Sequence, residues 1–181
     1  MGFVRIQSPL RKSLDEEREG KRKVADAQRR NPNGNLFLSH QRADDDYVAQ
    51  AIEILEGHGG TVYVDKKDQT LATMSNEEKA AALRGRILSA RKFVVLLTEN
   101  TSTSRWIPWE LGVADPKNTS SYVATLPFST TGNEENWGTQ EYFALYPQIR
   151  YGVWRAEWGK CYYVVNVSRD RAFKLDDWLS Y

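Results

Sequence analysis

A single glutamate follows two tryptophans in the stretch "SRWIPWELGVAD", residues 104–115. Proline is tolerated in a helix only near its first turn, so Pro108 predicts that Glu110 lies within the first two turns of a helix. The helix dipole and the free backbone amides at that end favour an ionised carboxylate. Trp106 lies four residues before Glu110 and shares its face of the helix. The stretch therefore predicts a carboxylate and an indole ring held side by side.

One carboxylate beside an indole suits few reactions when no metal ligands, no Cys-His or Ser-His pair and no glycine-rich phosphate loop accompany it. Hydrolysis of an ordinary glycoside usually needs two carboxyl groups, because a sugar alkoxide leaves only when a general acid protonates it. Nicotinamide leaves NAD+ as a neutral base, so one carboxylate that stabilises positive charge on the ribose is enough. The indole of Trp106 is suited to hold the pyridinium ring by a cation–π contact of about 1–2 kcal/mol.

The elements around this stretch alternate between apolar strands and amphipathic helices, which predicts an α/β fold of flavodoxin-like type, with a parallel sheet and helices on both faces. Strands are expected at 36–39, 61–65, 92–98 and 121–128. Helices are expected between the caps at Asp44 to Asp46 and the GHGG turn at 57–60, at 75–90 and from 106 onward. Beyond residue 128 we expect a short helix within 141–149, a last strand at 161–168 and a terminal helix at 175–181.

The first 33 residues differ from the rest of the chain, and we separate them as a basic, polar arm from a domain at 34–181. They carry nine Lys and Arg residues against five acidic ones. Ser13 and Glu16 form a capping box that predicts a helix, polar on nearly every side. Such a helix is expected to be solvated or frayed, or to dock on a neighbouring copy.

Composition excludes several classes of function. The 181 residues are 40% hydrophobic with a net charge of +1, which gives no electrostatic argument for binding nucleic acid or an anionic membrane. No apolar run approaches the ~20 residues that span a bilayer, and the N-terminus lacks the apolar region of a signal peptide. One cysteine and two histidines predict neither an internal disulfide nor a structural zinc site. We expect a cytoplasmic protein without metal or cofactor.

Ligands of open parallel sheets bind outside the carboxyl ends of the strands. Topology therefore brings together residues 39–42, 65–71, 98–104 and the helix start that carries Glu110. Next to the first of these loops, Asp44, Asp45 and Asp46 are interpreted as caps of the following helix.

The segments "LFLSHQRAD", "VYVD", "KFVVLLTENTSTSRWIPWELGVAD" and "VATLPF" occur in this order over residues 34–128. In sequence and spacing they resemble a bacterial stand-alone TIR (Toll/interleukin-1 receptor) domain of the enzymatic sort. The block "SRW...WELG.A" after a VVLLT strand is the most specific of these motifs.

The resemblance implies cleavage of NAD+, the substrate, to nicotinamide and ADP-ribose or a cyclic ADP-ribose. It places the essential glutamate of the W-x-x-x-E pattern at Glu110 and its tryptophan at Trp106. It also implies NAD+ contacts from His40, Gln41 and Arg42 after the first strand and from Asp65 after the second. The sequence departs from the family at His40, where a tyrosine is common, and at Gln41, where an arginine often follows.

The same resemblance implies self-association through TIR–TIR contacts and a role in anti-phage defence of the Thoeris type, where the nucleotide product activates a separate effector protein. Two other functions stay open at this stage. One is a TIR module that only binds other TIR surfaces, and the other is an enzyme like the nucleoside deoxyribosyltransferases.

Overall fold

The computed structural model describes residues 4–5, 13–65, 75–117, 122–129, 141–166 and 170–180. They form an α/β fold built on one sheet with the strand order β3-β2-β4-β5-β6-β7-β8, in which β1 adds to β5. The strands are β1 (Val4–Arg5), β2 (Leu36–Ser39), β3 (Val62–Val64), β4 (Lys92–Leu97), β5 (Val123–Ser129), β6 (Gln148–Gly152), β7 (Cys161–Asn166) and β8 (Arg171–Lys174). The main helices are α1 (Leu14–Arg29), α2 (Asp45–Gly57), α4 (Asn76–Ser89), α5 (Trp106–Ala114) and α6 (Leu175–Ser180).

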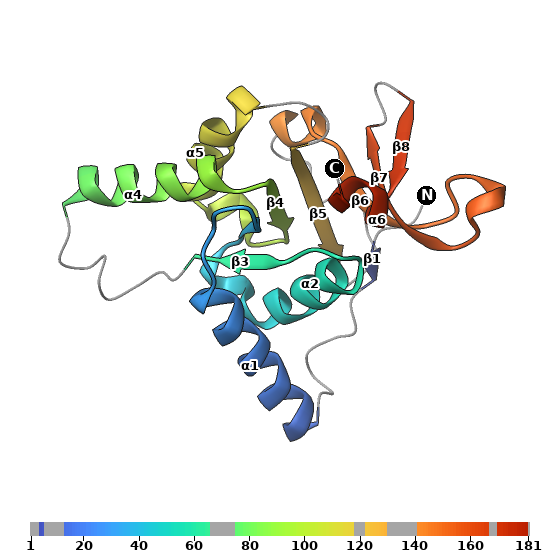
Figure 1. Ribbon diagram of the computed structural model, residues 1–181, viewed down its shortest axis with the longest axis horizontal. Helices are drawn as coiled ribbons and strands as arrows, with labels where there is room; N and C mark the ends of the chain where they lie inside the picture. The colour runs from blue at the N-terminus through green and yellow to red at the C-terminus, as the bar shows by residue number, and fades with distance from the viewer. Residues whose placement is uncertain are drawn as a thin grey trace.

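The flavodoxin-like prediction is confirmed for the first four strands of the path. The strands β3, β2, β4 and β5 are parallel neighbours, and helices cover both faces of the sheet. Buried side chains of α1, α2 and α6 pack on one face, and those of α4 and α5 pack on the other. Figure 1 shows α1 and α2 on the opposite side of the sheet from α4 and α5. All residues of β2 and β4 are buried, as expected for central parallel strands.

Local sequence signals set where the helices begin and end. Ser13 and Ser75 each cap a helix, and each forms a reciprocal capping box with the glutamate three residues later. Helix α2 ends at Gly57 within the "GHGG" turn. Gly59 there has a positive φ of 86°, and a Cβ atom at Gly60 would come within 2.8 Å of the Leu55 carbonyl oxygen. Only glycine fits this sharp return into β3.

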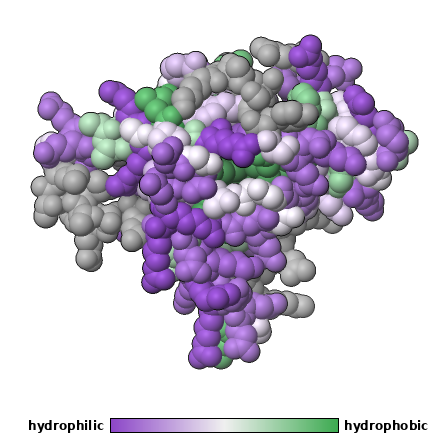
Figure 2. Space-filling model, viewed as in Figure 1, coloured by the Kyte–Doolittle hydropathy of each residue, from purple (hydrophilic) through white to green (hydrophobic). Residues whose placement is uncertain are grey.

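Helix α1 is formed as predicted, but its packing corrects our expectation. It contacts α2 and β3 of its own chain and is therefore not solvated all round. Gly20, Val24 and Ala27 lie on one face at a spacing of four and three residues. Ala27 is fully buried in the core and Val24 packs against it, while a side chain at Gly20 would crowd Ala49. The small residues allow close approach, and Figure 2 shows hydrophilic side chains along most of the visible surface of α1.

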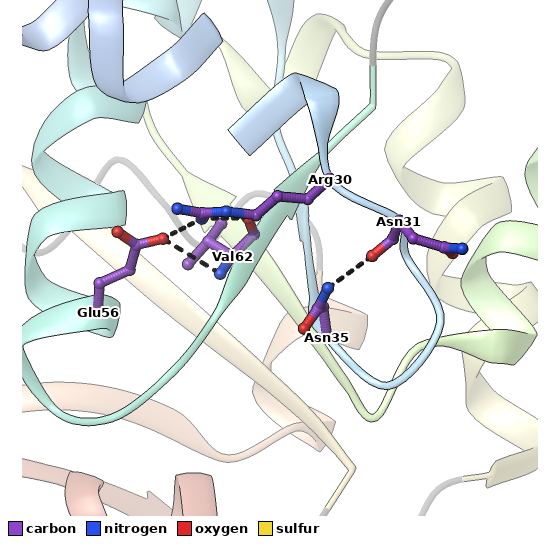
Figure 3. A network of polar contacts seen from close by, with 5 residues as sticks. All are labelled: Arg30, Asn31, Asn35, Glu56 and Val62. Atoms are coloured by element: carbon purple, nitrogen blue, oxygen red, sulfur yellow. Dashed lines mark hydrogen bonds and ion pairs between the residues drawn. The ribbon is translucent and has the colours of Figure 1, made fainter. Parts of the chain in front are cut away.

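A polar network fastens the end of α1 to the edge of the sheet (Figure 3). The Arg30 guanidinium pairs with the Glu56 carboxylate of α2 and donates to the Val62 carbonyl oxygen of β3 at 2.7 Å. The backbone amide of Val62 in turn donates to the same Glu56 oxygen at 3.3 Å. Arg30 therefore satisfies polar groups of both neighbouring elements.

The C-terminal part of the sheet differs from the sequence-based prediction. The helix expected within 141–149 is a short 3-10 helix, Glu141–Leu145, and the residues after Pro147 form the unpredicted strand β6. The strand β7 lies where the last strand was expected, and α6 is the expected terminal helix. However, β7 and the unpredicted β8 run antiparallel to their neighbours. The connection of residues 153–160 between β6 and β7 is short enough for antiparallel pairing without a crossover helix.

In the part of the chain that the structure describes, no helix combines the length and the apolar composition needed to cross a bilayer.

Replacing Arg30 with methionine is expected to lower the free energy of unfolding by about 1–2 kcal/mol, because Glu56 and the Val62 carbonyl lose a shared, partly buried donor. Urea denaturation measures this change. Arg29→Met is the matched control, since the Arg29 side chain is 74% exposed and forms an ion pair with Asp26 of its own helix. Equal effects of the two substitutions would contradict the proposed contribution of the network.

Lys92 is a buried cation at the start of β4, with an exposed fraction of 3%. Its Nζ atom lies 4.7 Å from the centre of the Trp178 ring of α6. Burial, with a smaller contribution from neighbouring Arg91, lowers the pKa of Lys92 to about 8. Between pH 8 and the ordinary lysine pKa, the unfolded chain therefore binds more protons at this position than the folded protein does.

The contribution of Lys92 to stability should accordingly rise with pH across this interval. At pH 7 we expect the free energy of unfolding of Lys92→Met to be about 1–2 kcal/mol larger than that of the wild type. The variant is the more stable protein because it no longer buries a charge. This excess should shrink as the pH approaches 10. Urea titrations of both proteins at several pH values measure the difference, and a difference that does not change with pH would refute the assignment.

Candidate functional site

Glu110 reaches the carboxyl end of the central strand β2. It is the fifth residue of α5, in the second turn of the helix. The Ser39 hydroxyl, on the last residue of β2, donates a hydrogen bond to Glu110 Oε2. Ser39 is only 2% exposed, whereas Glu110 is partly accessible. The hydrogen bond thus holds one carboxylate oxygen at the strand tip and leaves Glu110 in partial contact with solvent.

Sequence analysis placed Ser39 at the start of the segment 39–42 but gave its side chain no role of its own. The alternation of side chains along β2 could have indicated this role, because Phe37 and Ser39 point to the same face of the sheet. Phe37 packs among the side chains under α4 and α5. The Ser39 hydroxyl, two residues later at the end of the strand, therefore faces α5 and can contact a polar side chain of that helix.

The two tryptophans of α5 lie beside each other at different depths. Their rings meet edge to face, with centres 5.6 Å apart and an angle of 89° between the planes. Trp109 packs against the core under α5. Trp106 is 48% exposed, which leaves indole surface available to a flat ring. Trp106 and Trp109 are thus not equivalent, and only Trp106 presents a large open surface.

Asp65 follows β3 at the position beside Ser39. The register pairs Phe37 with Tyr63 and Leu38 with Val64, so the next pair in that register is Ser39 and Asp65. Alternation from Tyr63 places the Asp65 side chain on the face that also carries Ser39. Asp65 and the Ser39–Glu110 pair therefore lie at adjacent strand ends on one face of the sheet.

Other side chains hold the Asp65 carboxylate. Tyr63 donates its hydroxyl to Asp65 Oδ1 at 2.7 Å, and the Arg86 guanidinium of α4 forms an ion pair with the same oxygen. Burial, reinforced by the bond to Asp65, raises the pKa of the Tyr63 hydroxyl far above its ordinary value. Tyr63 therefore stays protonated and acts as a donor at physiological pH.

The residues after β2 form one wall of the site. His40 and Gln41 are half-buried and Arg42 is exposed. Gln41 Nε2 lies 3.4 Å from Thr103 Oγ1, a long hydrogen bond to the loop between β4 and α5. The loop after Asp65, predicted to contribute as far as residue 71, lies outside the described residues from 66 onward.

Asp44 corrects the prediction that it caps α2. It occupies the position before the helix, yet its side chain makes no capping hydrogen bond. The side chain is fully buried, and Oδ1 instead accepts a hydrogen bond of 2.8 Å from Asn100 Nδ2. In a helix cap this oxygen would accept from a backbone amide of α2. Here it accepts from the loop that precedes α5.

The structure brings together Ser39, Glu110 and, by register, Asp65. Gln41 and Asp44 connect the β2–α2 loop to the β4–α5 loop. Trp106 shares the helix of Glu110. His40 and Arg42 follow Ser39 in the β2–α2 loop. Among the described residues no group of three or more His, Cys, Asp or Glu side chains is arranged to hold a metal ion.

Comparisons with known proteins agree with this architecture. Residues 36–147, more than half of the chain, match the family described as the TIR domain. The chain is also 33% identical over 121 residues to a protein of Bacillus cereus (strain MSX-D12) named "Probable 3' cyclic ADP-D-ribose synthase ThsB'". The similarity covers 66% of this chain and 62% of the relative, so the chain spans less than two thirds of the relative's length. The range 36–147 includes Ser39, Asp65 and Glu110.

The Arg86–Asp65 ion pair should be measurable in a double-mutant cycle with Arg86→Met and Asp65→Asn. We expect a coupling of about 1 kcal/mol in the free energy of unfolding, because both side chains are only partly shielded from solvent. Raising the salt concentration should weaken the coupling. Arg84→Met, on the exposed side of the same helix, is the control and should show no coupling to Asp65. Additive effects of Arg86→Met and Asp65→Asn would show that the ion pair contributes nothing.

Proposed function

The chain belongs to the TIR-domain family, and on that premise we propose that it cleaves the bond between nicotinamide and ribose in NAD+. The observation that carries this proposal is the Glu110 carboxylate, held by Ser39 at the carboxyl end of β2 and still partly open to solvent. The name of the Bacillus cereus relative, a cyclic ADP-D-ribose synthase, supports a reaction on the same ribose.

The geometry suits a reaction in which the glycosidic bond breaks before a new bond is complete. The electron pair of the bond from ribose C1′ to the pyridinium nitrogen leaves with nicotinamide, which becomes neutral and needs no general acid. Positive charge develops on the ribose, where an adjacent carboxylate stabilises it more strongly than in the ground state. A fixed charge of this kind is worth about 3–4 kcal/mol of the barrier.

Each nearby group has a separate part in this mechanism. Ser39 holds one Glu110 oxygen, so the carboxylate is oriented before substrate arrives and does not reorganise during the reaction. The exposed ring of Trp106 stacks on the pyridinium by cation–π attraction. Asp65, His40, Gln41 and Arg42 line the same strand ends and contact the rest of the dinucleotide.

The ribosyl cation is captured in one of two ways. Attack by the oxygen of water, with loss of a proton, gives ADP-ribose. Attack by a hydroxyl of the same molecule, also with loss of a proton, gives a cyclic ADP-ribose. The choice depends on how well the bound product shields the cation from water. NAD+ is the substrate in this scheme, and no further cofactor is needed.

The biological setting that we propose follows the same reasoning. A released nucleotide acts as a signal when a separate effector protein binds it, which suits anti-phage defence of the Thoeris type. Self-association through TIR–TIR contacts would let a second copy complete the substrate site. The reaction is placed in the cytoplasm, where NAD+ is abundant and where a chain with a single cysteine needs no disulfide.

Incubation with NAD+ should release nicotinamide, and Glu110→Gln should reduce kcat by at least about 100-fold, because the neutral amide cannot balance the ribosyl cation. Mass spectrometry identifies nicotinamide and the adenine-containing product. Glu157→Gln, an exposed acid on a distant turn, is the matched control and should retain activity.

Circular dichroism and thermal unfolding should show that the Glu110→Gln protein remains folded. Undiminished turnover in that folded variant would end the proposal. Self-association without loss of NAD+ would favour a binding module, and a preference for deoxynucleosides over NAD+ would favour an enzyme of the deoxyribosyltransferase kind.

A further inference from the structure

Asp44 carries an unusual polar atom. It is fully buried, and its Oδ2 atom is the one buried side-chain oxygen or nitrogen in the described part of the chain without a hydrogen-bond partner. Burying a carboxylate oxygen without a donor is unfavourable. A residue chosen only for stability would not be expected here, because an uncharged side chain would avoid this cost.

The other oxygen of Asp44 accepts a hydrogen bond from the loop that precedes α5, and Asn100 continues the hydrogen bonding within that loop. Asn100 Nδ2 donates to Asp44 Oδ1 at 2.8 Å. The Asn100 carbonyl oxygen accepts from Thr103 Oγ1 at 2.8 Å, and the Asn100 amide donates to Thr98 Oγ1 at 3.1 Å. The bond from Asp44 is the charge-assisted member of this series and therefore the strongest type of link in it.

The same loop is hydrogen-bonded to the start of α5. The Ser104 amide donates to the Thr101 carbonyl oxygen at 3.0 Å, and Ser104 Oγ accepts from the Ile107 amide at 3.2 Å. Ile107 lies in the first turn of α5, between Trp106 and Glu110. The loop that carries Asn100 is thus hydrogen-bonded to the first turn of this helix.

Asp44 is also part of the opposite wall of the site. Its backbone amide donates to the Gln41 carbonyl oxygen at 2.9 Å, which closes the turn that follows Ser39 and His40. The pair of Asp44 and Asn100 therefore joins the loop that ends β2 to the loop that begins α5. The Asp44–Asn100 bond is partly buried, whereas the Gln41–Thr103 contact nearby is longer and solvent-exposed.

We infer that Asp44 and Asn100 form a positioning pair that fixes α5, and with it Glu110, relative to the end of β2. This inference rests on the proposed function, because it concerns how Glu110 is placed for cleavage of NAD+. Neither residue of the pair needs to touch the substrate. The buried charge is retained because it holds the amide of Asn100 more firmly than a neutral acceptor would.

A charge swap tests the inference. Asn100→Asp places two carboxylates against each other, and it should lower kcat for NAD+ by at least about tenfold with a smaller change in KM, because Glu110 acts mainly in the transition state. The double variant Asp44→Asn/Asn100→Asp restores an amide–carboxylate bond with the partners exchanged. Its kcat should return to within about threefold of the wild type. Glu157→Gln, an exposed acid of the turn between β6 and β7, is the charge control and should match the wild type.

Activity is measured per folded molecule, with thermal unfolding of every variant recorded alongside. A merely structural role would lower the melting temperature of Asn100→Asp and leave the kcat of the folded fraction unchanged, which would overturn the inference. A swap that stays as inactive as Asn100→Asp would also overturn it, since the charge of Asp44 would then act in another way. A wild type that does not consume NAD+ would instead refute the proposed function itself.

Discussion

The site depends on one constraint, namely that the central strand β2 is buried on both faces and ends in a hydroxyl. Leu36 and Leu38 face the core under α1, α2 and α6, and Phe37 faces the core under α4 and α5. A slip of one residue would turn the leucines toward α4 and α5 and Phe37 toward α1, α2 and α6, so each core would receive side chains of the wrong shape. That register places Ser39 at the sheet's carboxyl end, facing α5, where its hydroxyl meets Glu110.

Several polar groups at this end of the sheet satisfy one another across different elements. Ser39 of β2 binds Glu110 of α5, Tyr63 of β3 binds Asp65, and Arg86 of α4 completes the environment of Asp65. These bonds orient the carboxylates before any substrate arrives. In the proposed reaction, preorganised charge of this kind would stabilise the positive charge that develops on the ribose as the bond to nicotinamide breaks.

The two ends of the chain strengthen the sheet at its edges. Helix α1 packs on α2 beside the edge strand β3, and Arg30 supplies hydrogen bonds that a short edge strand lacks by itself. At the other end, β7 and β8 extend the parallel sheet in an antiparallel arrangement, and α6 packs behind them. Lys92 and Arg91 at the start of β4 both contact α6, through the Trp178 ring and the Ser180 carbonyl oxygen respectively.

The amino-acid sequence by itself determined the local elements wherever one strong signal acts over a few residues. The capping boxes at Ser13 and Ser75, the glycine turn after α2 and the apolar runs of β2 and β4 all predicted the structure correctly, because propensity and periodicity agree there. Pro108 in the same way predicted that Glu110 lies early in its helix.

Other features were decided only by tertiary structure, because they depend on residues far apart in the chain. Whether α1 packs or stays solvated depended on Gly20 and Ala27 meeting α2, and β6 and β8 became strands by pairing with β7. The sequence predicted Asp44 as a helix cap. The fold instead brings Asn100 to its side chain, and Asn100 donates the hydrogen bond. The sequence thus placed Glu110 early in a helix, whereas its bond to Ser39 required the packing of α5 over β2.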